Sequence, residues 1–402
     1  MTDVTVVTDL DLPEIDYNQP GFGPRTYHEQ LAAARSRGWL AHSPIAYFVL
    51  DQESGDFFLR ARQTAFPGRE IAALCGVTAG PLHAFIDANI LNLTGERHRR
   101  LRALVGHAFT PKVADRWRPV MREFLARLWA GLGGATHAEF VAAIAKPYAS
   151  QVMAAVLGAP AGDAPKLHRL SSLIQDQFDI QALSTRLADI DQAAAEGRDY
   201  VLELLESRKN DPRDDLVSIL LHAEEQGDKL SHDECVNLVL NVLAGGIDTT
   251  QSELAHGLRL FAAHPDQWRL LAERPDQYAK AAVSEVLRAE PIAPFTARLV
   301  LEDIEYRGVR FPAGTLVAVC AERANREHDG EAFDITAARD GKLYTFGAGP
   351  HFCLGANLAR AELEEALTFL APRTPGLALD GEPVLGGVEG IYNVDSLPLR
   401  WL

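Results

Sequence analysis

The feature that most constrains this chain is a helical pattern that begins at Ser231 and runs to Ala263, where His264 and Pro265 end it. Ser231 followed three residues later by Glu234 is the signature of a capping box at a helix N-terminus. At 1.5 Å per residue the helix would be about 45 to 50 Å long, enough to cross a whole domain. Residues 236–243 are apolar on nearly every face, so we expect this helix to be buried.

The charge of the chain limits its partners. Its 402 residues include 39 Lys plus Arg and 55 Asp plus Glu, a formal net charge of -16, which disfavours binding to nucleic acid or to an anionic membrane. The longest apolar stretch, residues 236–247, is interrupted by Asn237, Asn241 and two glycines and falls short of the roughly 20 residues of a membrane-spanning helix. Residues 1–20 lack the basic and apolar regions of a secretory signal. We therefore expect a cytoplasmic protein.

The fold class predicted is mainly α with small β sheets. Two further helices are expected at 265–274 and 275–290, each with Pro in its first turn. After Pro291, β-branched segments separated by turn signals predict strands, and shorter strand patterns occur near both ends of the chain. The predicted strands are 47–51, 57–59, 297–304, 306–311, 314–320 and several within 377–401. Without a repeat, a low-complexity tract or a linker, residues 1–402 are predicted to form one domain.

Residues 346–355, which read Phe-Gly-Ala-Gly-Pro-His-Phe-Cys-Leu-Gly, are the most informative segment. The glycines and proline exclude regular structure up to Cys353, and leucines at helical spacing follow it. Unpaired N–H groups at a helix N-terminus stabilise a thiolate, so Cys353 is a candidate metal ligand or nucleophile. The alternatives are an inert buried cysteine, or a phosphate-binding loop, for which the required Lys-Ser/Thr is missing. The other three cysteines form no Cys-x-x-Cys pair, which argues against a disulfide framework and a structural zinc site.

Two adjacent glycines, Gly245 and Gly246, interrupt the long helix just before Asp248 and Thr249. Each glycine inside a helix costs about 1 kcal/mol relative to alanine, so we do not expect two adjacent glycines here without a specific structural need. We expect Thr249 to donate to the carbonyl of Gly245 and bend the helix, so that an acid and an alcohol face a small groove. The alternative is a notch for helix packing that contains buried hydroxyls.

Two charged segments have the patterns of solvent-exposed helix surfaces. Glu285 and Arg288 lie three residues apart on one helix face, a spacing that most often makes an exposed salt bridge. Residues 95–102, with His98 and Arg102 on one face, look like a basic helix surface, and a nucleic-acid site there fits poorly with so acidic a chain.

Taken together, these segments resemble the cytochrome P-450 family of haem-thiolate monooxygenases, in the family's order along nearly the whole chain. The resemblance implies the family's triangular fold with haem b between the long helix and the Cys353 helix. Cys353 would be the axial ligand of the haem iron within a loop that includes Phe346, Gly349 and Gly355. The residues implied to contact the haem or its propionates are His98, Arg102, Gly245, Arg298 and His351.

The resemblance also assigns the remaining motifs. Asp248 and Thr249 would relay protons to dioxygen, as general acid catalysis requires. Glu285 and Arg288 would be structural, with a partner near residues 325–326. Residues 325–342 are shorter than the family usually shows and lack its usual Arg before Phe-Asp, which leaves the packing of that segment open.

The implied reaction inserts one oxygen atom of O₂ into an apolar organic molecule, with electrons from NAD(P)H through a separate ferredoxin and ferredoxin reductase. A monomer is expected. The alternatives are a peroxide-driven peroxygenase and a non-catalytic haem sensor, and the acid and alcohol pair argues against both. The substrate pocket implied by the resemblance is mostly apolar and comprises Leu82, Phe85, Ile86, Asn89, Leu240, Leu243, Ala244, Ile292, Pro294, Phe295, Ile391 and Tyr392.

Overall fold

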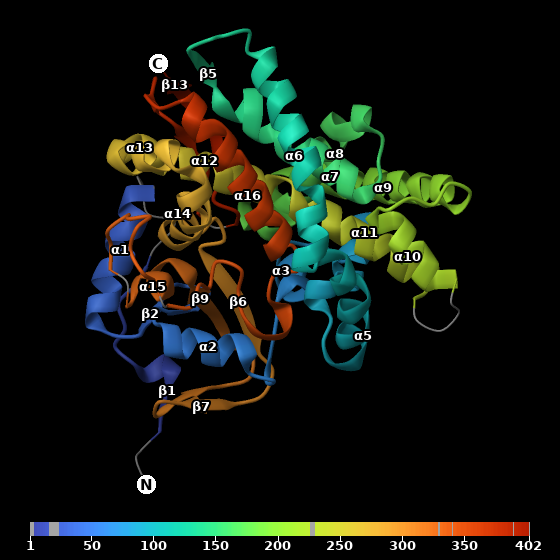
Figure 1. The fold of residues 1–402 in the computed structure, drawn as a ribbon. Helices are drawn as coiled ribbons and strands as arrows, with labels where there is room; N and C mark the ends of the chain where they lie inside the picture. Colours follow the sequence, from blue (N-terminus) through green and yellow to red (C-terminus); the bar gives the residue numbers. More distant parts are fainter. Residues whose placement is uncertain are drawn as a thin grey trace.

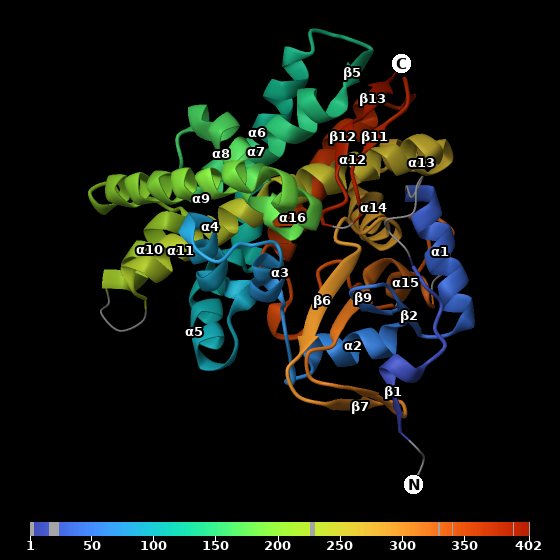
Figure 2. The same cartoon turned by 180° about the vertical axis from the view of Figure 1, so that it is seen from behind.

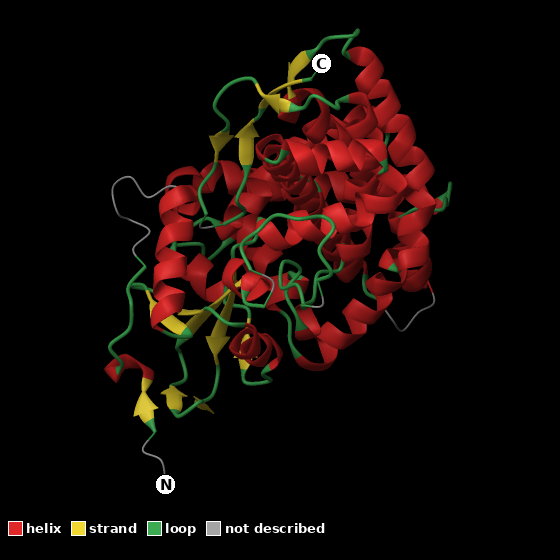
Figure 3. Cartoon of the chain, turned by 60° about the vertical axis from the view of Figure 1, so that its left-hand side comes forward, coloured by secondary structure: helices red, strands yellow, loops and turns green. Residues whose placement is uncertain are grey.

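The computed structural model describes residues 4–15, 24–225, 230–328, 330–339, 341–388 and 390–401. Helices make up most of it, and short strands gather in two places, one near the N-terminus and one near the C-terminus (Figure 3). The predicted class, mainly α with small β sheets, is confirmed.

The helices surround a long central pair and the C-terminal helix α16, as Figures 1 and 2 show from opposite sides. They are α1 (Pro24–Arg37), α2 (Gln52–Arg60), α3 (Gly68–Leu74), α4 (Gly80–Ala88), α5 (Gly95–Gly106), α6 (Pro111–Gly131), α7 (Lys146–Leu157), α8 (Ala164–Gln175), α9 (Ile180–Lys209), α10 (Leu216–Glu225), α11 (His232–Gly246), α12 (Asp248–Ala263), α13 (Pro265–Glu273), α14 (Pro275–Ala289), α15 (Ala321–Arg326) and α16 (Ala356–Leu370).

The strands form four small sheets. The largest has the order β2-β3-β9-β6-β4, and the others are β1-β8-β7, β10-β13-β5 and β11-β12. The strands are β1 (Thr5–Val6), β2 (Leu40–His42), β3 (Tyr47–Val49), β4 (Thr64–Ala65), β5 (His137–Glu139), β6 (Phe295–Val300), β7 (Ile304–Tyr306), β8 (Val309–Phe311), β9 (Leu316–Cys320), β10 (Ala378–Leu379), β11 (Val384–Leu385), β12 (Val394–Ser396) and β13 (Pro398–Arg400).

The long helix predicted for 231–263 is divided into two consecutive helices, at the place where the two glycines and Thr249 predict a bend. The capping box at its start is present, with the Glu234 amide donating to Ser231 Oγ and the Ser231 amide to the Glu234 carboxylate, both at 3.2 Å. The break falls at Ile247, where φ is -102° and ψ is -66°. It follows the two glycines, which weaken the helix where side-chain packing does not restore it.

A correction concerns residues 57–59, predicted as a strand but found in α2. Asp51 caps this helix by accepting from the Ser54 amide at 2.8 Å. Phe58 and Leu59 are buried on its inner face, below the largest sheet. An apolar run this short does not distinguish a strand from a buried helix segment.

The helix α16 lies at the centre of the helical part, packed against α6 on one side and α14 on the other. Its N-terminus follows directly from the loop that contains Cys353. The helices α11 and α12 lie on the other side of this loop, and the space between these helices and the loop holds the candidate site.

Candidate functional site

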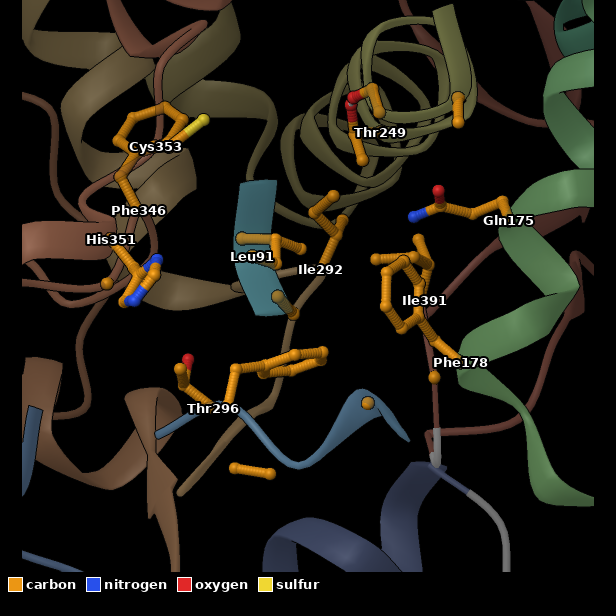
Figure 4. Close-up of a pocket in the computed structure, with 18 of the residues that line it drawn as sticks. Leu91, Gln175, Phe178, Thr249, Ile292, Thr296, Phe346, His351, Cys353 and Ile391 are labelled. Atoms are coloured by element: carbon orange, nitrogen blue, oxygen red, sulfur yellow. Dashed lines mark hydrogen bonds between the residues drawn. The ribbon is translucent and has the colours of Figure 1, made fainter. Parts of the chain in front are cut away.

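An apolar cavity of about 1030 Å³ opens between α11–α12, the Cys353 loop and the segment 292–298 (Figure 4). This exceeds most ligand sites, which occupy roughly 300–1,000 Å³, and leaves room for a large cofactor together with a substrate. Fourteen of the residues singled out from the sequence line it: Ile86, Asn89, Arg102, Ala244, Gly245, Thr249, Ile292, Phe295, Arg298, Phe346, His351, Cys353, Gly355 and Ile391.

Six residues expected in the substrate pocket do not line the cavity: Leu82, Phe85, Leu240, Leu243, Pro294 and Tyr392. The first four pack into the main helical core, because they occupy the faces of α4 and α11 that are turned toward other helices. Tyr392 packs on the ring of His256, with ring centroids 4.4 Å apart, and is fully buried. The Pro294 carbonyl accepts from the Ala321 amide at 2.9 Å.

The Cys353 loop presents its sulfur to the cavity. The Cys353 amide donates to the Phe346 carbonyl at 2.9 Å, and the Sγ atom points into the cavity (Figure 4). Burial raises the pKa of the thiol, while the backbone N–H groups of Gly355 and Ala356 and the charge of Arg102 act in the opposite direction. The loop thus supplies one soft, electron-rich ligand beside a helix N-terminus.

Gly349, expected in the haem loop, is not part of the cavity wall. Its φ is +70°, and a Cβ there would lie 2.7 Å from the Leu59 carbonyl oxygen. This glycine allows the loop to turn closely over α2.

Three cationic or titratable side chains, Arg102, Arg298 and His351, line one side of the cavity, and His98 lies behind His351 without lining it. The rings of His98 and His351 lie 4.3 Å apart, and His98 Nε2, although buried, has no hydrogen-bond partner among the described residues. Arg298 is 2% exposed and forms no ion pair with a described carboxylate, and burial lowers its pKa to about 10. Burial and the neighbouring charges of His98, Arg298 and Arg102 lower the pKa of His351 to about 3.

The buried Arg298 charge without a described counter-ion is unfavourable unless an anion completes the site, and Arg102 and the two histidines offer further donors to such an anion. A haem carries two propionates, and Arg groups bind carboxylates through paired hydrogen bonds. The cluster and the Cys353 thiol therefore fit this cofactor at its two chemically distinct positions.

The two glycines of the α11–α12 break serve different purposes. A Cβ at Gly245 would meet no atom within 4 Å, so this position opens onto the cavity. A Cβ at Gly246 would lie 2.1 Å from Met153 Cε, so this glycine admits the close packing of α7. Thr249 Oγ1 donates to the Gly245 carbonyl at 2.8 Å, as the sequence predicts.

Asp248 does not share the cavity with Thr249, contrary to the expectation from the sequence. Its carboxylate accepts from Ser171 Oγ at 3.0 Å and Ser172 Oγ at 2.7 Å, and His168 Nε2 lies 3.6 Å away. Consecutive helix residues point about 100° apart, so only one of the two can face the cavity. The serines of α8 hold the buried acid away from the cavity.

Glu285 and Arg288 form a buried ion pair, 2% and 1% exposed, with Arg288 Nε and Nη2 each 2.8 Å from a carboxylate oxygen. The third member is Arg339, whose Nη2 lies 3.0 Å from Glu285 Oε1. The partner expected near residues 325–326 is therefore wrong, because Arg326 binds Glu331 and the Ala289 carbonyl. The cation that completes this cluster is Arg339, whereas the sequence analysis expected it near residues 325–326.

Several residues of the cavity wall carry no signal in the sequence pattern. Gln175 and Phe178 come from the junction between α8 and α9 and point into the cavity opposite Cys353 (Figure 4). Glu253 also lines it, one turn after Thr249 on α12. Its spacing of four residues from Thr249 is the only signal that could have found it.

Comparisons with known proteins identify the family. A family model described as cytochrome P450 matches residues 77–370. The chain is 36% identical to luteothin monooxygenase from Streptomyces thioluteus, over 97% of this chain and 96% of that protein. It is 37% identical to vitamin D(3) 25-hydroxylase from Pseudonocardia autotrophica, over 75% and 73%.

Solved structures agree. The structure of P450BioI in complex with an acyl carrier protein ligated to hexadec-9Z-enoic acid superposes with a TM-score of 0.86 at 27% identity, covering 94% of this chain and 99% of that one. No helix among the described residues is long and apolar enough to cross a membrane. This chain therefore belongs to the cytochrome P450 family, as a monooxygenase whose cofactor is a b-type haem.

Proposed function

We propose that this chain oxidises a large apolar natural product, inserting one atom of O₂ into a C–H bond, with electrons from NAD(P)H through a separate ferredoxin and ferredoxin reductase. The observation that carries the proposal is that Cys353 Sγ and Thr249 point into the same apolar cavity. When bound, the haem supplies the activation of dioxygen, and the protein supplies orientation and protons.

The roles of the haem-site residues follow from their positions. Cys353 would be the axial thiolate, and Arg102, Arg298, His98 and His351 would hold the propionates through charge-assisted hydrogen bonds. Gly245, with open space at its Cβ position, leaves room above the haem for a small molecule.

The shape of the cavity supports a large apolar substrate. Its far wall, opposite Cys353, is formed by Phe178, Ile391 and Ile292, with the Gln175 amide as a polar contact (Figure 4). Such a wall suits an extended apolar molecule with one hydrogen-bonding group. The relative that matches 97% of this chain is named luteothin monooxygenase, which makes luteothin a rational first probe.

The test combines binding and turnover. We expect luteothin or a compound of similar size to shift the ferric Soret band toward the high-spin position, and to yield a product with one added oxygen when ferredoxin, reductase and NAD(P)H are present. Product from hydrogen peroxide alone, at an equal or higher rate, would contradict the proposed electron route. The reduced, carbon-monoxide-bound spectrum should lose its thiolate-type Soret band in Cys353→Ser, and an unchanged band would remove Cys353 as the ligand.

A further inference from the structure

Glu253 is a buried acid that the interpretation above does not use. It lies on α12, is 3% exposed, and neither carboxyl oxygen makes a hydrogen bond with a described residue. An ionised carboxylate in such a position would be strongly unfavourable, whereas a protonated one is tolerated. A side chain of this kind is not explained by packing, because an apolar residue of the same size would satisfy the site better.

The position of Glu253 relates it to Thr249. The two residues are four apart on α12, so their side chains lie on one face about one helical turn from each other. Both line the cavity. Thr249 Oγ1 donates its proton to the Gly245 carbonyl, which leaves its oxygen able to accept a hydrogen bond from a second donor.

Glu253 lies where α12 packs against α14 and α16, and the Ile292 backbone is close enough to act on its carboxyl group. It also lines a small gap with Val283 and Val286 of α14 and Leu363 and Leu367 of α16, the helix that follows Cys353. Gln175, Phe178 and Ile391, which form the far wall together with Ile292, come from other elements. The link between Glu253 and the oxygen chemistry is therefore its place on the same face of α12 as Thr249.

Burial is the main reason that Glu253 favours its protonated form. Burial raises the pKa of Glu253 to about 8; the Ile292 backbone and Arg360 of α16 oppose this rise, and Glu290 at the end of α14 adds to it. Glu362 of α16 lines the same cavity, and burial raises its pKa well above the usual range. Asp248, the other acid near Thr249, accepts hydrogen bonds from serine hydroxyls of α8, away from the cavity.

We propose that Glu253 is the acid that delivers protons to the reacting oxygen at Thr249, directly or through one water. The inference rests on the proposed function. One turnover consumes the substrate, O₂, two protons and two electrons, and yields the oxidised substrate and water. In each of the two proton transfers the O–H bond of Glu253 breaks, its proton passes to the oxygen atom that leaves as water, and the carboxylate takes up a new proton from bulk solvent through water in the cavity. Both electrons come from NAD(P)H.

The first test is spectroscopic and independent of turnover. In the infrared spectrum of the haem-bound ferric protein, the difference between wild type and Glu253→Gln should show one protonated-carboxyl band that disappears with a midpoint near the pKa of about 8. As a second measure, wild type should become less stable to urea than Glu253→Gln as the pH rises from about 4.5 toward 8, because only the folded state holds the proton. A Glu253 that is already ionised at neutral pH would overturn the proposal.

The second test separates proton delivery from substrate contact. Glu253→Gln keeps the size and a hydrogen-bond donor but has no acidic proton. We expect its product formation to fall by about 100-fold, the low end of what a general acid contributes, with NAD(P)H consumption continuing as hydrogen peroxide. Glu253→Asp, which retains an acid, should recover part of the loss, and Thr249→Ala serves as the reference for uncoupling.

The outcomes are distinguishable from failure of the proposed function. If wild type forms no product with any probe, the proposed function fails whatever Glu253 does. If wild type is coupled and Glu253→Gln is equally coupled, the inference alone is refuted. Weaker binding in the Soret titration with unchanged coupling would make Glu253 a substrate contact and also refute it.

Discussion

Replacing Glu285 by Ala should destabilise the protein far more than its spacing in the sequence suggests. Glu285 accepts from Arg288 Nε and Nη2, from Arg339 Nη2 and from the Asp334 amide, at 2.8 to 3.0 Å. Its removal leaves the Arg288 guanidinium, 1% exposed, with the carbonyls of Gly330 and Ala332 as its remaining partners in the described part of the chain. Breaking one partner from a buried pair costs about 3–5 kcal/mol.

That loss is a large share of a typical unfolding free energy of about 5–15 kcal/mol. With a urea m-value of about 3 kcal/mol/M, the unfolding midpoint of the haem-bound protein should fall by about 1 to 2 M, measured by far-UV circular dichroism.

The matched control is Glu96→Ala. Glu96 and Arg99 also lie three residues apart on one helix and form an ion pair, but their side chains are 81% and 73% exposed. Solvent screens such pairs, so the control should leave the midpoint unchanged within error. Equal shifts for Glu285→Ala and Glu96→Ala would refute the argument that burial decides the effect.

Three further predictions follow from the structure. Arg298→Leu should weaken haem binding about 10- to 100-fold in a haem-transfer assay, since a hydrogen bond to a charged group contributes about 1.5–3 kcal/mol; unchanged affinity would remove it from the propionate site. Gly245→Ala should not lower the urea midpoint, because a Cβ there meets no atom and alanine favours a helix by up to about 1 kcal/mol, yet it should reduce product formation. For His28, burial lowers the pKa, but hydrogen bonds and charges from Glu290 and Glu322 outweigh this and raise it to about 9. The stability that His28 contributes is full below its ordinary pKa of 6.5 and is lost as the pH rises through about 9, so the difference in unfolding free energy between wild type and His28→Gln should shrink from about pH 6 to about pH 10.

Prediction from the sequence succeeded where local chemistry controls the outcome. The Ser231 capping box, the bond from Thr249 to the Gly245 carbonyl and the strands that follow Pro291 all depend on residues near one another in the chain. The haem loop could be recognised because its glycines, proline and cysteine are contiguous. These features need no knowledge of distant partners.

Prediction failed where residues distant in the sequence decide the outcome. The direction of Asp248 is set by two serines of α8, and the third member of the Glu285 cluster, Arg339, comes from a segment whose path the sequence does not specify. Leu240 and Leu243 looked like pocket residues, but α11 turns them toward other helices.

The sequence by itself determined the family motifs, the caps and the weak point in the long helix, because each is a local preference of the backbone or of adjacent side chains. Only the tertiary structure decided which acid faces the cavity, which cation completes the buried pair, and that Glu285 is buried while Glu96 is exposed. The physical reason is that burial and electrostatic partners depend on which elements pack together, and the same three-residue spacing is compatible with either environment.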